Sequence, residues 1–419
     1  MNDGVVEMAL IFTFLTPLAV AGLALINAGL GRSRSAAHTM LASLSVMGVA
    51  ALAYMVCGFA FQSFAGGPSH VFLVGGRQWS WLGAGPFFLR AMLWDSSSVV
   101  LLFGMLGATV SALIPLGAAS DRWRLSASLL STAFFAGFTY PLFAHWAWGG
   151  GWLQNLGANC GLSRGFLDIG GAGVIHASGG LTALSIAWIV GARRGKYLDG
   201  LPAAIPGHNA VIVLFGCLLA LPGWLGLNGA GLLLFNGANT EGAIAKVAVN
   251  TLLTAGCACL AAAAVTRARY GRPDASLCAN GWVGGLVASS AVAALVNPMA
   301  AALIGAIAGA LVALSVEILD LRLALDDPGG AISVHGVAGI WGLLAAGLFG
   351  SGDWLAQTAG VATLLGFVFP LTYGFNWLLN RFYPQRVSPD GERHGMDLHE
   401  LGAGAYPEFV THHEDFLSR

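Results

Sequence analysis

The chain consists of long apolar runs separated by short polar segments. Each run has about 20 residues, the length that a helix needs to cross a hydrocarbon core of ~30 Å. The runs show no alternating strand pattern, and lipid requires backbone polar groups to be satisfied internally, so helices are predicted. Eleven spans are predicted, at residues 6–30, 37–63, 96–118, 126–148, 168–192, 208–230, 244–266, 276–296, 298–319, 331–350 and 356–380.

Basic residues gather at alternate ends of these runs, and positive charge marks the cytoplasmic side of a membrane protein. They follow the odd-numbered runs: Arg32, Arg34, Arg122, Arg124, Arg193, Arg194, Lys196, Arg267, Arg269, Arg272, Arg322, Arg381, Arg386, Arg393 and Arg419. The other ends have Arg77, Arg90 and Arg164, and Lys246 lies near the outer start of the seventh run. We therefore predict a multi-pass protein of the plasma (inner) membrane, with its N-terminus outside and its C-terminus cytoplasmic. Residues 1–381 form the predicted membrane domain and residues 382–419 the cytoplasmic tail.

One nine-residue pattern occurs twice. DIGGAGVIH at 168–176 and DPGGAISVH at 327–335 both read Asp-x-Gly-Gly-Ala-x-x-x-His, and a glycine follows each histidine after four residues, at Gly180 and Gly339. Each copy opens the fifth span of a five-span half. An odd number of spans per half inverts the second half about an axis in the membrane plane. The prediction is an all-α membrane protein of two inverted five-helix repeats plus an eleventh helix.

The repeated aspartates and histidines are the candidate functional residues. Asp168 and Asp327 precede their helices and suit N-capping. Each histidine follows by eight residues, about 12 Å along a helix and near mid-depth. Inversion of the halves brings His176 and His335 to the same depth. An ionisable residue inside a membrane is a functional-site hypothesis by default.

Two neutral imidazoles can share one hydrogen bond, which leaves other ring nitrogens to contact a small polar solute or to pass a proton. The surrounding apolar residues suit a small, hydrogen-bonding, easily deprotonated solute. The alternative is that His176 and His335 each pack between helices and bond a backbone carbonyl. Asp168 is likewise either a pure cap or a functional aspartate.

Composition supports a membrane protein and excludes several other classes. The chain is 56% hydrophobic and 9% charged, against about 25% charged in soluble proteins. Its net charge is −1 and it has no basic run, so nucleic acid is not a predicted partner. The six cysteines are scattered and suit packing. Two histidines without a carboxylate at their depth do not make a metal site, and neither a cofactor nor an enzymatic activity is predicted.

Motifs along nearly the whole chain resemble the ammonium transporter (Amt/Rh) family. They are AHWAWGGGWL at 144–153, LDIGGAGVIHASGG at 167–180, GWLGLNGAG at 223–231, DDPGGAISVHGVAGIWG at 326–342 and GMDLHELGAGAY at 395–406. The resemblance implies the eleven-span Amt/Rh fold with a pore at His176 and His335. It also implies a homotrimer in membrane lipid, with one pore in each subunit.

The resemblance further implies that ammonium binds at an outer vestibule, loses a proton and passes the histidines. Trp148 matches the vestibule tryptophan, whose ring face would contact the cation. Phe103 and Asp168 are the other residues assigned to ammonium recruitment, and Asp327 is the repeat-related structural aspartate. The alternative for Trp148 is a purely interfacial aromatic residue.

Three positions depart from the family pattern. Two phenylalanines usually cross the pore entrance, but the first position here is Gly107 and the second is Leu227. The vestibule serine position is Gly231. Both gate rings and one vestibule hydroxyl are therefore expected to be missing, which makes this a divergent member.

The sequence favours an ammonium transporter or channel. One alternative is an ammonium sensor, which uses the same fold to signal through a cytoplasmic C-terminal output domain; another is a channel for a gas or other small solute. The end of the tail, with Phe409, Val410, Phe416 and Leu417, is spaced like the start of an amphipathic helix. It is either the start of a fused signalling segment or an ordinary frayed terminus. A PII-type signal protein is a possible cytoplasmic partner.

Overall fold

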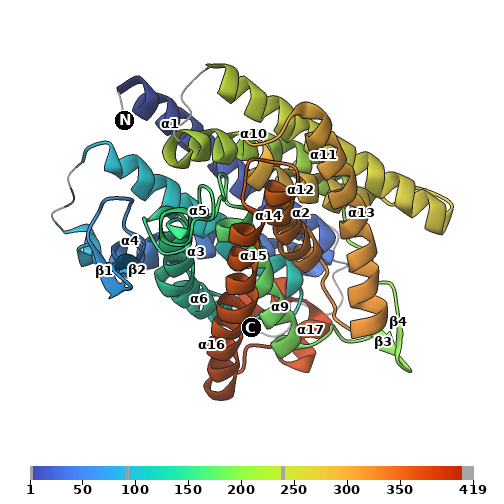
Figure 1. Cartoon of the computed structure of the whole chain (residues 1–419). Helices are drawn as coiled ribbons and strands as arrows, with labels where there is room; N and C mark the ends of the chain where they lie inside the picture. The colour runs from blue at the N-terminus through green and yellow to red at the C-terminus, as the bar shows by residue number, and fades with distance from the viewer. Residues whose placement is uncertain (1–2, 91, 93, 237–240, 408–419) are drawn as a thin grey trace.

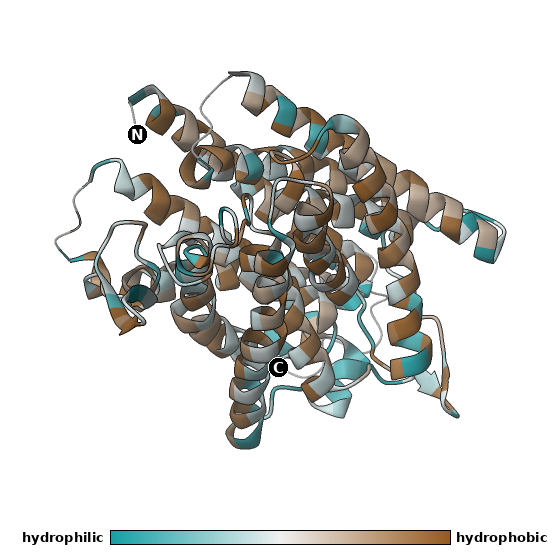
Figure 2. Cartoon of the chain, viewed as in Figure 1, coloured by the Kyte–Doolittle hydropathy of each residue, from teal (hydrophilic) through white to brown (hydrophobic). Residues whose placement is uncertain are grey.

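The computed structural model of the chain describes residues 3–90, 92, 94–236 and 241–407. In these ranges ten helices are long and apolar enough to cross a membrane, and a shorter apolar helix covers Ile332–Leu348. Figure 2 shows hydrophobic residues along the helices and hydrophilic ones concentrated near their ends. The predicted fold of eleven helices is confirmed.

The first five spans contain eight α-helices and several wider π-helical turns. The α-helices are α1 (Asp3–Leu15), α2 (Pro17–Leu30), α3 (Ala36–Ala53), α4 (Phe59–Gln62), α5 (Ser97–Ala118), α6 (Leu125–Phe134), α7 (Tyr140–Trp148) and, after the turn η5 (Ala172–Ala177), α9 (Ser178–Val190). Turns at Tyr54–Gly58 and Phe135–Thr139 join the pieces of the second and fourth spans. The first span is divided at Thr16, because Pro17 provides no N–H to continue the ladder.

The second half follows the same order. Its spans are α10 (Ala210–Phe235), α11 (Glu241–Tyr270), α12 (Ala275–Val292), α13 (Pro298–Leu323) and the turn η6 (Ile332–Val337) with α14 (Ala338–Leu348). The eleventh span is α15 (Trp354–Thr363), η7 (Leu364–Val368) and α16 (Phe369–Phe382). Asn209, Asp274 and Asn297 cap α10, α12 and α13 by accepting a backbone N–H three residues on.

Two small antiparallel strand pairs lie outside the spans and were not predicted. β1 (Ser69–Val74) pairs with β2 (Arg77–Gly83), and β3 (Tyr197–Leu198) pairs with β4 (Leu201–Pro202). They lie at opposite edges of the helical bundle (Figure 1). Gly75 and Gly76 form the two-residue turn of the first hairpin with φ of 60° and 75°, the backbone that two-residue hairpins favour. Short helices also form at Phe87–Leu89 and Leu156–Cys160.

The two halves cross at glycine contacts that the repeat relates to each other. A Cβ on Gly180 would lie 2.2 Å from the backbone nitrogen of Gly336. A Cβ on Gly339 would lie 3.1 Å from the backbone nitrogen of Ala177. Gly339 is the repeat equivalent of Gly180, and Gly336 that of Ala177, so the contact is reciprocal. Small residues allow this backbone approach, which lipid-embedded helices use for packing.

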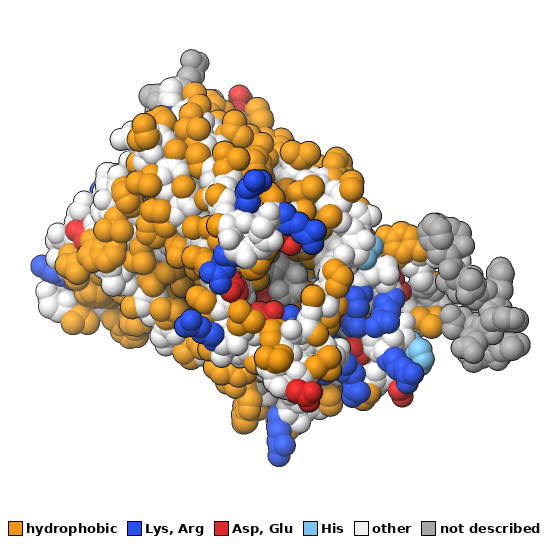
Figure 3. All heavy atoms as spheres, turned by 90° about the vertical axis from the view of Figure 1, so that its right-hand side faces the viewer, with side chains coloured by type: hydrophobic (Ala, Val, Ile, Leu, Met, Phe, Trp, Pro, Cys, Tyr) orange, Lys and Arg blue, Asp and Glu red, His pale blue; other side chains and the backbone are white. Residues whose placement is uncertain are grey.

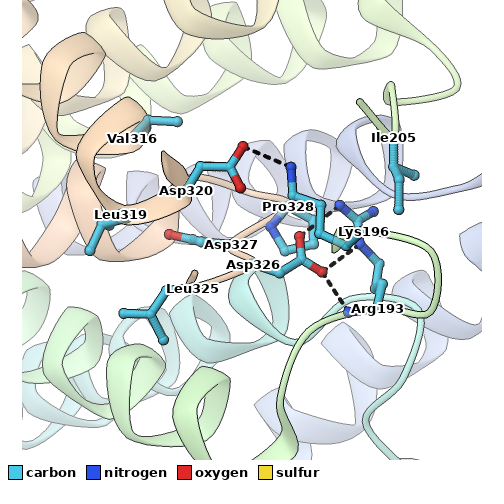
Figure 4. A pocket seen from close by; sticks show the side chains of 10 residues that line it. All are labelled: Arg193, Lys196, Ile205, Val316, Leu319, Asp320, Leu325, Asp326, Asp327 and Pro328. Carbon is cyan, nitrogen blue, oxygen red and sulfur yellow. Dashed lines mark hydrogen bonds and ion pairs between the residues drawn. The ribbon is translucent and has the colours of Figure 1, made fainter. Parts of the chain in front are cut away.

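A buried ionic cluster holds the loops together at the end of the molecule near Asp327, here called the Asp327 end. Arg193 Nε lies 2.9 Å from Asp326 Oδ2, and Arg193 Nη1 lies 3.1 Å from Asp121 Oδ2. Arg32 Nε also lies 3.1 Å from Asp121 Oδ2. Figure 4 shows Arg193 on Asp326 beside a second pair, Lys196 on Asp320, around a cavity of about 150 Å³. The cluster joins the loops that follow α2, α5, α9 and α13.

The chain after α16 folds back onto the Asp327 end through α17 (Pro389–His394) and η8 (Asp397–Leu401). Asp397 accepts the backbone N–H of His38 at 2.7 Å, so the tail caps α3. Glu400 accepts the backbone N–H of Leu125 at 2.9 Å at the start of α6. The division into residues 1–381 and 382–419 stays a prediction. The predicted amphipathic segment with Phe409, Val410, Phe416 and Leu417 lies outside the described residues.

Asp326→Asn is expected to destabilise the protein, because it removes one of the two carboxylates that pair with the buried Arg193, and the carboxylate that lies 3.7 Å from the buried Arg122. Removing one member of a buried ion pair costs about 3–5 kcal/mol. Burial by itself raises the pKa of Asp326, but Arg193 and Arg122 more than offset this, and the pKa falls below its ordinary value. An aspartate whose pKa is lower in the folded protein than in the unfolded protein, where it is about 3.9, stabilises the fold at pH values above this value. This stabilisation is lost as the pH falls through the pKa of the folded protein.

Thermal unfolding in detergent tests this expectation. At pH 7 the Asp326→Asn variant should melt well below the unmodified protein, and the gap should narrow in acid. Asp274→Asn is the matched control, because Asp274 is an exposed cap and asparagine caps as well as aspartate. Equal melting of Asp326→Asn and the unmodified protein at pH 7 would contradict the assignment.

Candidate functional site

Both copies of the repeated motif build the same cap. The Asp168 carboxylate accepts the backbone N–H groups of Gly173 and Val174, at 2.9 and 2.7 Å. The Asp327 carboxylate accepts those of Ala331 and Ile332, at 3.0 and 2.7 Å. These amides open η5 and η6, where helical partners are lacking. The capping expected of both aspartates is therefore observed. Asp168 Oδ1 is buried and has no hydrogen-bond partner within the described part of the chain.

The two glycines of the motif have different tasks. The second glycines, Gly171 and Gly330, have φ of 94° and 66°, a backbone that glycine adopts without strain. The first glycines allow close contacts: a Cβ on Gly170 would lie 2.1 Å from Asn228 Oδ1, and one on Gly329 would lie 2.8 Å from the Cα of Gly117. The motif therefore turns the chain sharply against a neighbouring helix before each histidine.

The structure brings the two histidines together in the interior. Their ring centroids lie 5.4 Å apart at an angle of 31°. His176 is 0% and His335 is 3% exposed. Both lie in π-helical turns, η5 and η6, which are common at functional sites. The indole of Trp224, from α10, stacks on the His176 ring at 5.0 Å and 8°.

Two neutral imidazoles can share a hydrogen bond, but none joins these two rings in the described part of the chain. Neither ring nitrogen of His176 has a hydrogen-bond partner among the described residues, and the same holds for His335 Nδ1. The stacking of Trp224 fixes the plane of the His176 ring, and the two imidazoles meet at an angle instead of edge to edge. The alternative in which a backbone carbonyl satisfies His176 is not observed either. Buried polar atoms normally have partners, so these free nitrogens are available to a small solute.

A cavity of about 170 Å³ lies beside Asp168, at the opposite end of the molecule from Asp327. It is lined by Ala147, Trp148, Gln154, Arg164, Phe166, Leu167, Asp168, Ile169, Phe235 and Asn236. The Trp148 indole N–H donates to the carbonyl oxygen of Asp168, which fixes the ring beside the cap. Arg164 donates to the Asn236 side chain at 2.7 Å, so its guanidinium is held at the cavity wall.

Three aromatic rings meet at this cavity. Phe235 lies parallel to Trp148, with centroids 4.6 Å apart and an angle of 4°. Phe103 meets Trp148 at 5.7 Å and Phe235 at 5.5 Å, both at steep angles. One face of the Trp148 ring is therefore covered by Phe235. Trp148 and Asp168 thus line one cavity, and Phe103 packs against Trp148 and Phe235 without being part of its lining. The roles of these residues in ammonium recruitment stay a prediction.

The three departing positions are occupied in ways that the structure explains. A Cβ on Gly107 would lie 2.4 Å from the hydroxyl of Tyr140, so the Tyr140 side chain takes the space beside this glycine. A Cβ on Gly231 would lie 2.0 Å from the carbonyl oxygen of Ile169, so a serine there requires the motif loop to move. Leu227 is fully buried in the core.

Sequence reasoning missed Trp224 and Phe235. Both lie on α10 with Leu227 and Gly231, and these four residues are spaced by three, four and four positions. That spacing defines one face of a helix. The signal was therefore present, as a stripe on the helix that carries two of the departing positions. Tyr140 had no comparable signal, because it comes from a different span than Gly107.

A second, small cavity of about 10 Å³ reaches His335 from the other side. Its lining includes Asn27, Asn280 and Gly329. About this volume is needed for one water-sized centre. The cavity at the two asparagines therefore reaches His335 itself, whereas the lining of the cavity at Trp148 and Asp168 includes neither histidine. In the described ranges no group of three or more His, Cys, Asp or Glu side chains could hold a metal ion.

A bundle of membrane-length apolar helices with ionisable residues buried inside it is typical of a membrane channel or transporter. Comparisons agree with this class. A model of the Ammonium Transporter Family matches residues 7–406. The ammonium transporter Amt2 of Archaeoglobus fulgidus is 35% identical in sequence, and the match covers 96% of this chain and 88% of that protein. The ammonium transporter of Bacillus subtilis is 31% identical over 96% of both chains.

Solved structures give the same result. A protein described as "Sensor Amt Protein" has a TM-score of 0.86 and 28% identity, covering 96% of this chain and all of its own. Mep2 of Saccharomyces cerevisiae has a TM-score of 0.80 at 23% identity, covering 93% and 90% of the two chains, and shows the fold alone. The chain belongs to the ammonium transporter family, whose members are transporters and channels and not enzymes.

Phe235→Ala is expected to strengthen ammonium binding, because it uncovers the face of Trp148. A cation over an aromatic face gains about 0.5–2 kcal/mol, so the gain should lie between about twofold and thirtyfold in affinity. Calorimetric titration of purified protein with ammonium chloride, against sodium chloride, measures it. Phe72→Ala removes an exposed ring on β1 and is the control. Weaker binding by Phe235→Ala would show instead that its ring helps to hold the cation.

Proposed function

We propose that this chain conducts ammonium across the plasma (inner) membrane along a path that passes His176 and His335. The observation that carries the proposal is the pair of buried imidazoles with free ring nitrogens, of which His335 lines a small cavity. Membership of the ammonium transporter family supplies the solute. Ammonium matches this arrangement: its N–H groups can donate to imidazole nitrogens and to a carboxylate, and its positive charge can interact with an aromatic face.

The cavity beside Asp168 recruits the cation. Trp148, Phe103 and Asp168 are its binding residues in this proposal: the carboxylate attracts the charge, and the free Oδ1 offers an acceptor. A charged solute is costly in the apolar interior beyond the cavity. Ammonium therefore gives up a proton to the free Asp168 Oδ1, and its nitrogen passes between the histidines as neutral ammonia. The ring nitrogens of the histidines replace the hydrogen bonds that ammonia had with water, and they pass the proton along the same path, so that charge crosses the membrane.

Orientation and assembly are also part of the proposal. Lys and Arg side chains gather on the face over the ends of α11 and α13 (Figure 3), which favours this face as cytoplasmic. The N-terminus is then outside and residues 382–419 are a cytoplasmic tail. The family resemblance favours a homotrimer with one pore per subunit, and a PII-type signal protein as a cytoplasmic partner.

Ammonium sensing is the second candidate function. The gate positions Gly107 and Leu227 lack phenylalanine, and the solved protein described as a sensor matches this fold with a TM-score of 0.86. A sensor retains the binding cavity and passes the signal to a fused cytoplasmic domain. Ammonium-evoked current and uptake of labelled methylammonium separate the two: reconstituted protein that binds ammonium and shows neither current nor uptake favours the sensor.

His176→Ala and His335→Ala are expected to change the ammonium-dependent current of proteoliposomes. Each variant removes a ring whose free nitrogens replace the water that solvates the permeating solute. We therefore expect a lower current and a changed selectivity between ammonium and potassium. His70→Ala alters an exposed histidine on β1 and serves as control. Unchanged current and selectivity in both histidine variants would contradict a role in conduction and leave the histidines with a packing role.

Asp168→Asn is expected to raise the ammonium concentration needed for half-maximal response. Asparagine preserves the cap and removes the charge, so folding should be retained while attraction of the cation is lost. Removing one charge-assisted contact costs about 1.5–3 kcal/mol, or roughly tenfold or more in affinity. Asp327→Asn makes the same change in the other repeat and should leave this concentration near its original value. An equal effect of the two variants would indicate a shared capping role.

A further inference from the structure

An arginine-lined cavity at the Asp327 end lies apart from the histidines and has no part in the proposed conduction. Its volume is about 380 Å³, larger than the cavity of about 170 Å³ beside Asp168. Its walls come from three segments far apart in the sequence. They supply Arg32 and Arg34 from the loop after α2, Arg194 from the loop after α9, and Asp390, Glu392 and Arg393 from α17.

The carboxylates of this cavity pair with only one of its arginines in the described ranges, since Arg194 Nε lies 4.0 Å from Glu392 Oε2. Glu392 is buried, and its Oε2 lies 2.7 Å from a nitrogen of Arg386, which is outside the cavity lining. Its other oxygen accepts the backbone N–H of Arg194 at 2.7 Å. Arg34 and Arg393 form no ion pair with any residue in the described ranges. The lining therefore has four arginines against two carboxylates, an excess of two positive charges.

Two features hold Arg32 and Arg34 at the wall of the cavity. Arg32 Nε pairs with Asp121, and its Nη2 is buried without a hydrogen-bond partner among the described residues. Arg34 and Arg393 are exposed, so their guanidinium groups are the ones that an anion in the cavity can reach. The tail packs on Arg34 at Gly395, where φ is 102° and a Cβ would lie 2.6 Å from the Arg34 Cβ. This contact fixes the base of the Arg34 side chain beside Arg32.

We propose that this arginine cavity binds a phosphate-bearing anion. Guanidinium groups form paired hydrogen bonds with phosphate oxygens, and a phosphate monoester carries about −1.5 to −2 charges at neutral pH, which matches the excess of the lining. The volume lies in the range of small-ligand sites. A soluble phosphate compound and the headgroup of an anionic lipid share this chemistry. The bound anion joins the tail to the loops that follow α2 and α9.

Calorimetric titration of purified full-length protein tests the proposal with two probes. Inorganic phosphate represents the soluble source, and dioctanoyl phosphatidic acid represents the lipid source. The test variant is Arg34→Gln with Arg393→Gln, two exposed residues without ion pairs in the described chain, so the fold should be retained. Arg272→Gln changes an exposed arginine in the loop after α11 and is the matched control. Size-exclusion profiles and melting temperatures verify folding of each variant.

Binding of either probe by the unmodified protein, weakened about tenfold or more in the double variant and unchanged in Arg272→Gln, supports the site. Binding of phosphate identifies a soluble ligand, and binding of phosphatidic acid alone identifies a lipid headgroup. The proposal is overturned if neither probe binds, or if the double variant binds as tightly as the unmodified protein. Ammonium binding measured on the same samples keeps this result separate from the proposed conduction.

Discussion

The geometry of the site depends on one backbone contact, the crossing of the two segments that carry the histidines. Gly180 lies against Gly336, and Gly339 lies against Ala177, so no side chain larger than a methyl separates the backbones. The histidine centroids are 5.4 Å apart as a result. Apolar surfaces gain little by packing together in lipid, so close contact between small residues supplies the attraction. The position of the imidazoles thus follows from the glycines and not from an interaction between the rings.

That crossing requires helices that begin inside the molecule, and the two aspartates satisfy the first backbone N–H groups of these helices. The first amides of η5 and η6 would otherwise be unsatisfied in an apolar environment, at several kcal/mol each. Asp168 and Asp327 accept two of them in each copy. At the Asp327 end the chain leading into η6 is also held by Asp326 on Arg193. Caps and ionic cluster together fix the depth at which each histidine lies.

Much of this arrangement could be predicted because it obeys rules that act locally. Span length and the alternation of arginines follow from the lipid, and the repeated motif predicted the inverted histidine pair. The hairpin after α4 was missed although Gly75 and Gly76 signalled its turn. The orientation of the two rings could not be predicted, because the ring plane of His176 depends on Trp224, a residue of the other half. Contacts between distant spans leave no trace in local pattern.

The departures from the family pattern are connected through α10. Because Gly231 has no side chain, the loop at Ile169 packs directly on this helix. The same helix face continues one turn further to Phe235, whose ring covers Trp148. An aromatic cover is therefore present at the cavity, but it comes from the end of α10 instead of from positions 107 and 227. The absence of phenylalanine at positions 107 and 227 therefore does not leave the entrance open. The loop contact at Gly231 and the ring of Phe235 lie on one face of a single helix, and both close the entrance.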